Sequence, residues 1–295
     1  MATTTPVDPT VIAALEALQG SGPGQSILFK SLWDEYTGPM VMGTPGGGTY
    51  YNGNTRTIYI DPYMLPNAKL ADGQPSPYAL TYSQLATVIA HELTHALFNT
   101  PNYVTTANPD AAVAAGSSTE AIGYLSQYVV ALQLGDTSIF SKGPEFPKLK
   151  SPLASLNITQ SEVSGIGTLS ALQSSSFFSA AVAVPGALTT VVADRHISSN
   201  DALTYRGLWQ DLWVMNQYGF SVYNPASATS SSPVAPVRSF WVAAPLSDDS
   251  IKVTSSTSGD NPTWTFSGTN IQIDLNRFLL PVGGTQLSGV TLPPS

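Results

Sequence analysis

The chain contains 295 residues, no cysteine and three histidines, and only 10% of its residues are charged, compared with about 25% in an ordinary soluble protein. Its 42% of hydrophobic residues argue against a disordered chain. The net charge of −8 gives nucleic-acid binding almost no electrostatic support, and the absence of cysteine excludes disulfides and thiol catalysis. The longest apolar stretch, residues 177–193, is interrupted by Pro185 and Gly186 and is too short for a membrane span of about 20 residues.

The first third of the sequence predicts two helices and then a small sheet. Helical patterns occupy residues 8–20 and, more briefly, 26–36. Asn52-Gly53 lies between the strand-like runs GTYY and TRTIYID, which is the strongest short signal for a hairpin. We therefore expect a small antiparallel sheet at residues 38–61, followed by a loop rich in proline and glycine at 62–80.

The middle of the sequence is predominantly helical. One helix is predicted to begin at Thr81, where Thr81 and Gln84 can form a capping box. Another is predicted from Ser117 to about Leu134, after a loop that contains Asn108-Pro109, and residues 136–160 look irregular. Further helices are expected near 161–175, 177–193 and 199–218.

Beyond Gly219 the composition changes to a Ser/Pro-rich linker at residues 228–236 and then to strand-like alternation in SIKVTS, TWTFSG and IQIDLNRF. The pattern as a whole indicates an α+β protein in three parts. These parts are residues 1–100, with the sheet and the helix that begins at Thr81; residues 101–225, a helical subdomain; and residues 226–295, a linker and a β-rich segment.

The helix that begins at Thr81 contains the pentapeptide His91-Glu92-Leu93-Thr94-His95. Residues four apart on a helix are neighbours, so both imidazoles can bind one tetrahedral zinc ion. Glu92 lies between them in sequence and points toward the open metal position, where it can take a proton from a zinc-bound water. Two surface histidines on an amphipathic helix are the simpler alternative, yet two of only three histidines lie in this motif.

A catalytic zinc ion usually has three protein ligands. Glu120, on the next predicted helix, is the best candidate for the third, although Ser117-x-x-Glu120 would also be a capping box. Asp110, in the preceding loop, is a second candidate. The remaining histidine, His196, is expected to donate a hydrogen bond to the oxyanion, or to replace Glu120 as the third ligand.

Three segments, in order, resemble the active-site motifs of thermolysin-like zinc metallopeptidases, the gluzincins: HELTHA at 91–96, Gly116-x-x-x-Glu120-Ala121-Ile122, and His196-Ile197-x-Ser199. The resemblance implies a zincin-like fold, zinc held by His91, His95 and Glu120, Glu92 as the base, and His196 with a tyrosine at the oxyanion. Tyr103 is the first candidate for that tyrosine and Tyr205 the second. Where the family has an acidic residue four places after the zinc-binding glutamate, this chain has Tyr124.

The sequence thus predicts an exported zinc metalloendopeptidase that acts on a peptide or protein substrate, with an inhibitor or immunity protein as a further expected partner. An effector peptidase that cleaves peptidoglycan peptides would use the same residues. A non-catalytic exported protein with a structural zinc ion is the alternative from another class, and it would need a fourth protein ligand. Asp248, Asp249 and Asp260 could help to bind calcium, although solvated turns are the simpler interpretation.

Overall fold

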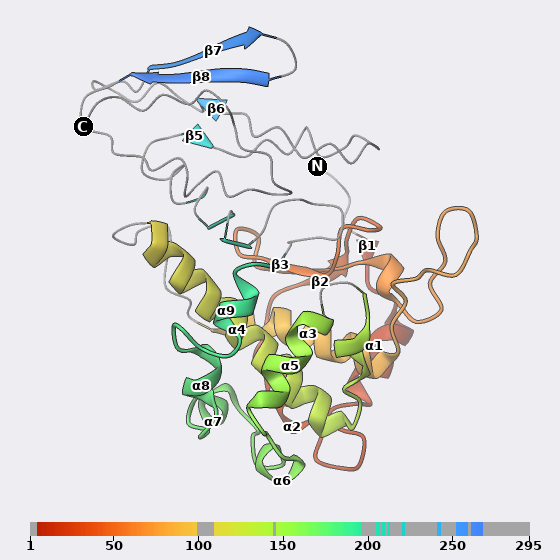
Figure 1. Ribbon diagram of the computed structural model, residues 1–295. Coiled ribbons are helices and arrows are strands. Elements are labelled where there is room, and N and C mark those ends of the chain that lie inside the picture. Colours follow the sequence, from red (N-terminus) through yellow and green to blue (C-terminus); the bar gives the residue numbers. More distant parts are fainter. Residues whose placement is uncertain are drawn as a thin grey trace. The chain divides into compact units, whose positions relative to one another are not determined.

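The computed structural model describes residues 5–98, 109–143, 146–195, 205–206, 208–209, 212, 220–221, 241–242, 252–258 and 261–267 (Figure 1). The chain is a mixed α and β protein, as the sequence predicts, and it divides into two compact units. The first comprises Met1–Pro101 and Ser117–Val192, and the second comprises Asn102–Gly116 and Ala193–Ser295. The division into three parts expected from the sequence stays a prediction.

The first unit contains a four-stranded sheet in the order β1-β2-β4-β3. Its strands are β1 (Thr5–Pro6), β2 (Met40–Met42), β3 (Tyr50–Asn52) and β4 (Thr57–Ile60). Strands β3 and β4 are antiparallel, as expected, and so are β1 and β2, but β2 and β4 run parallel. The expectation of a purely antiparallel sheet is therefore wrong. Strand β3 lies at one edge of the sheet, and β4, which follows it in the chain, lies between β3 and β2. No local sequence pattern reveals this order.

Three helices of this unit form the core with the sheet: α1 (Pro9–Glu16), α2 (Ile27–Glu35) and α3 (Tyr82–Leu97). Both α1 and α2 pack against α3, and α3 contacts β3. The side chains of Ile58 and Ile60 on β4 are fully buried. The capping box of α3 is confirmed, because Thr81 Oγ1 accepts from the Gln84 amide at 3.1 Å and Gln84 Oε1 accepts from the Thr81 amide at 3.0 Å.

A buried aspartate fixes the glycine-rich segment that leads into β3. The carboxylate of Asp61 accepts hydrogen bonds from the amides of Gly46, Gly48 and Tyr63 at 2.9 to 3.0 Å. Tyr63 belongs to a short 3-10 helix, η1 (Pro62–Met64), in the segment expected to be a loop. Because one carboxylate bonds to both segments, it holds the start of the edge strand against the end of β4.

Helix α4 (Pro109–Leu134) begins eight residues before the predicted start at Ser117. Proline is common in the first turn of a helix, where its missing N–H removes no internal hydrogen bond. Ser117 is buried inside the helix, so the capping box with Glu120, which was the alternative to a ligand role for Glu120, does not exist. Asp110, expected in a loop, lies in the first turn of this helix.

The rest of the first unit is built from short helices: η3 (Ser138–Ser141), α5 (Pro147–Ser155), α6 (Gln160–Val163), α7 (Leu169–Gln173), α8 (Phe178–Val182) and α9 (Thr189–Val192). The continuous helices expected at 161–175 and 177–193 are each two helices, and η3 and α5 lie in the stretch expected to be irregular. The second break falls at Pro185-Gly186, where proline cannot continue a helix.

The side chain of Gln133 on α4 joins three parts of the first unit. Its Oε1 accepts hydrogen bonds from Ser26 Oγ at 2.5 Å and from the Leu28 amide at 3.2 Å, at the start of α2. Its Nε2 donates to the carbonyl oxygens of Val163 at 2.7 Å and Ile166 at 2.9 Å. One amide group thus connects α2 and α4 to the segment after α6.

Within the second unit, β5 (Phe220–Ser221) pairs with β6 (Trp241–Val242), and β7 (Lys252–Ser258) pairs with β8 (Asn261–Ser267), both antiparallel. The strand expected in IQIDLNRF lies outside the described residues. The buried indole of Trp209 packs directly on Gly116, where an added Cβ would lie 2.3 Å from the ring. Among the described residues, no helix combines the length and apolarity needed to span a membrane.

Candidate metal centre

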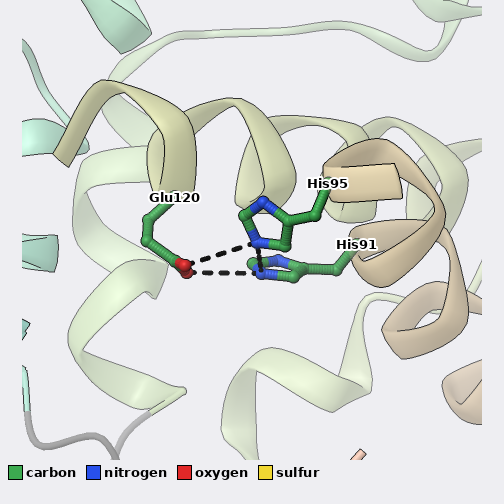
Figure 2. Close-up of side chains that lie close together, drawn as sticks. All are labelled: His91, His95 and Glu120. Atoms are coloured by element: carbon green, nitrogen blue, oxygen red, sulfur yellow. Dashed lines mark hydrogen bonds and ion pairs between the residues drawn. The ribbon is translucent and has the colours of Figure 1, made fainter. Parts of the chain in front are cut away.

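Helix α3 presents its two histidines one turn apart on the same face (Figure 2). The Nε2 atoms of His91 and His95 lie 2.9 Å apart, and the two rings meet nearly edge to face, with centroids 4.6 Å apart. His91 is buried, and the side chain of His95 is 15% exposed. The spacing of four residues therefore produces the convergence of ring nitrogens that the sequence predicts.

Glu120 on α4 faces both imidazoles (Figure 2). Its Oε1 lies 3.3 Å from His95 Nε2, and its Oε2 lies 3.4 Å from His91 Nε2. His91, His95 and Glu120 together could hold a metal ion. Within the described part of the chain, no other group of three or more potential ligands meets this arrangement, so the structure brings together the three residues that the sequence selects.

The charges of these groups shift one another's pKa values. Burial lowers the pKa of His95, but the charge and hydrogen bond of Glu120 outweigh it and raise that pKa to about 9. For Glu120 the signs are reversed. Burial raises its pKa, but the two imidazoles outweigh burial and hold the pKa well below its ordinary value. In the absence of a metal ion, a protonated His95 beside an ionised Glu120 is therefore the favoured state at neutral pH.

Glu92 lies beside this group, and its carboxylate is held by the backbone of the edge strand. The amide of Tyr51 on β3 donates to Glu92 Oε2 at 2.8 Å. Burial raises the pKa of Glu92, and the nearby imidazoles and the Tyr51 amide only partly oppose this. A carboxylate with a raised pKa holds a proton more readily than an ordinary one, so beside a potential metal site it can both accept and return a proton.

Two further residues of α4, Gly123 and Tyr124, contact the His91 ring, and sequence reasoning did not assign either of them a role there. A Cβ added to Gly123 would lie 2.8 Å from His91 Cε1, so the imidazole lies directly on the helix backbone. The ring of Tyr124 packs on the same imidazole, with centroids 4.3 Å apart. The signal that could have identified Gly123 is a glycine in the interior of a helix, which is destabilising unless close packing requires it.

The other predicted site residues are not placed at this centre. Tyr103 and His196 lie outside the described residues, as do Asp248, Asp249 and Asp260. The side chain of Asp110 is not described. Tyr205 belongs to the second unit, where its ring lies 5.4 Å from that of Trp209, centroid to centroid.

No protein-family model, curated protein or solved structure matches this chain. The function must therefore be inferred from the geometry and chemistry of His91, Glu92, His95 and Glu120 themselves.

Proposed function

We propose that the protein is a zinc-dependent metallopeptidase of zincin-like fold that hydrolyses peptide bonds, with Glu92 as the general base. The observation that carries the proposal is the convergence of His91 Nε2, His95 Nε2 and the Glu120 carboxylate, at separations of 2.9, 3.3 and 3.4 Å. Atoms bound to one tetrahedral zinc ion at about 2.0–2.1 Å lie about 3.3–3.4 Å from one another. Small side-chain movements would therefore suffice to bind the ion.

The donor set also fits zinc chemically. Two imidazoles and one carboxylate form a common ligand set of catalytic zinc sites, whereas structural sites are closed by four protein ligands. Three ligand side chains converge here among the described residues, which favours an open catalytic site over a structural one. When bound, a zinc ion supplies a coordinated water with a pKa of about 7 and polarises a substrate carbonyl.

The protein's own groups supply the proton transfers. Glu92 is positioned to accept the proton of the attacking water and to return it to the leaving amine. The Tyr51 amide binds Oε2, which leaves Oε1 of Glu92 to take the proton in the proposed reaction. Strand β3 is one edge of the sheet, so an extended peptide substrate could bind by adding a strand to it, although the N–H of Tyr51 already donates to Glu92.

The test compares two carboxylates on different helices. Purified protein should contain about one zinc ion per chain by elemental analysis and should cleave fluorescence-quenched peptides in a reaction that chelators stop. Glu92→Gln keeps an acceptor for the Tyr51 amide but cannot accept a proton, so it should retain the metal and lose at least about a hundredfold in turnover. Glu16→Gln, at an exposed position on α1, is the matched control and should change neither.

Two results would refute the proposal. Turnover by Glu92→Gln that equals that of the wild type would exclude Glu92 as the base. Zinc binding that survives His91→Ala without loss of affinity would exclude the metal site, because that substitution removes a ligand.

A further inference from the structure

His91 and His95 both point at Glu120, and the ring of His91 also lies directly on the backbone of helix α4. A Cβ on Gly123 would lie 2.8 Å from its Cε1, 2.9 Å from its Nδ1 and 3.0 Å from its Nε2. The ring therefore occupies the space that any side chain at position 123 would fill. Tyr124, the next residue, packs on the same imidazole at a centroid distance of 4.3 Å and an angle of 57°, and it is only 6% exposed.

Among the described residues, none orients His91 in the way that is usual for a metal-binding histidine. Such a histidine almost always donates its second ring N–H to a carboxylate, a carbonyl or a water, and this bond fixes the tautomer and the orientation of the ring. Nδ1 of His91 is buried and makes no hydrogen bond with any described residue. Within the described part of the chain, the orientation of this imidazole therefore depends on what packs against it.

We propose that Tyr124 is a positioning residue of the metal centre, which acts with Gly123 by clamping the His91 ring so that Nε2 faces Glu120 and His95. The inference rests on the proposed metal site and assigns to aromatic packing the role that a hydrogen bond ordinarily has. In this role Tyr124 touches neither the metal nor the substrate and acts only through His91. Without its ring, His91 can turn away, and metal binding must then restore the orientation at an entropic cost.

The experiment measures zinc affinity by competition with a chelator of known affinity, using the full chain. Tyr124→Phe keeps the ring and should bind zinc within about twofold of the wild type, whereas Tyr124→Leu should bind it about ten to a hundred times more weakly. Tyr128→Leu is the matched control. Tyr128 lies one turn further along α4, where its ring packs on Phe140 at 5.5 Å, so its loss should lower thermal stability and leave zinc affinity unchanged.

A spectroscopic measurement separates positioning from general stability. Visible absorption of the cobalt-loaded protein reports the geometry of the ligands, so Tyr124→Phe and Tyr128→Leu should reproduce the wild-type spectrum and Tyr124→Leu should alter it. If Tyr124→Leu does not fold, Gly123→Ala replaces it, because its added methyl group would displace the His91 ring and should weaken zinc binding by a similar factor.

The outcomes distinguish the two proposals. If the wild type binds zinc and Tyr124→Leu, or Gly123→Ala, binds it with the same affinity, the positioning role is overturned and the proposal of a metal centre stands. A wild-type protein that binds no zinc overturns both. Equal losses of affinity in Tyr124→Leu and Tyr128→Leu would show that the effect is one of general stability, and they would also overturn the positioning role.

Discussion

The pH dependence of metal binding follows from the contact between His95 and Glu120. A histidine binds a metal ion only as the neutral imidazole, and the Glu120 carboxylate raises the pKa of His95 to about 9. At pH 7 the metal ion must therefore displace a proton, which costs about 3 kcal/mol for two pH units. We expect the apparent affinity for zinc to rise nearly tenfold per pH unit from pH 7 toward 9.

Calorimetric titration with zinc at pH 7, in two buffers of different ionisation enthalpy, counts the protons released and should find close to one from His95. An independent measurement is the NMR titration of the metal-free protein. The chain has three histidines, so the His95 signal can be assigned by comparison with His95→Gln. Its midpoint should lie near pH 9, and in Glu120→Gln it should fall, because the charge that raises it is removed.

The same pKa shifts make the free energy of unfolding of the metal-free protein depend on pH. The folded-state pKa of His95 is raised, so its contribution to the free energy of unfolding is complete below pH 6.5 and is lost as pH rises through about 9. The pKa of Glu120 is lowered, so its contribution is present above the ordinary value of 4.5 and is lost as pH falls well below it.

The predicted pH dependence of metal binding has a clear contrary outcome. Zinc affinity that stays constant between pH 7 and 8.5, with no proton released at pH 7, would refute it.

Three further substitutions test contacts on α4 and β3. Gln133→Leu removes four hydrogen bonds and should lower the free energy of unfolding by about 2–4 kcal/mol in urea denaturation. Gln127→Leu on the same helix should be neutral or slightly stabilising, because Gln127 Nε2 is buried without a described partner. Tyr51→Pro removes the N–H that holds Glu92 and should shift the acidic limb of the activity profile to higher pH, whereas Tyr51→Phe should not.

The parts of the site that depend on one helix could be predicted from the sequence. Thr81 and Gln84 mark the start of α3, and the four-residue spacing of His91 and His95 places both rings on one face. Glu120 could be proposed as a ligand only because it lies on the next predicted helix and matches a known motif. Its alternative role in a capping box required the helix to begin at Ser117. The helix begins at Pro109 instead, so this role does not apply.

The parts that depend on contacts between distant segments could not be predicted. The sequence predicts a late start for α4 because Asn108-Pro109 is typical of a turn. In the structure Pro109 lies in the first turn of the helix. The hydrogen bond from Tyr51 to Glu92 comes from a backbone amide, which any residue except proline could supply. The packing of Tyr124 on His91 requires the approach of α3 and α4, and a tyrosine in a helix predicts only a buried ring.

The charges of His95 and Glu120 favour the convergence of these side chains. Glu120 is ionised and largely buried, and a buried carboxylate is stable only beside a positive charge. In the metal-free protein the proton on His95 supplies that charge, and a divalent ion would replace it with a larger one. Zinc binding at the proposed site would therefore exchange the proton of His95 for the metal ion.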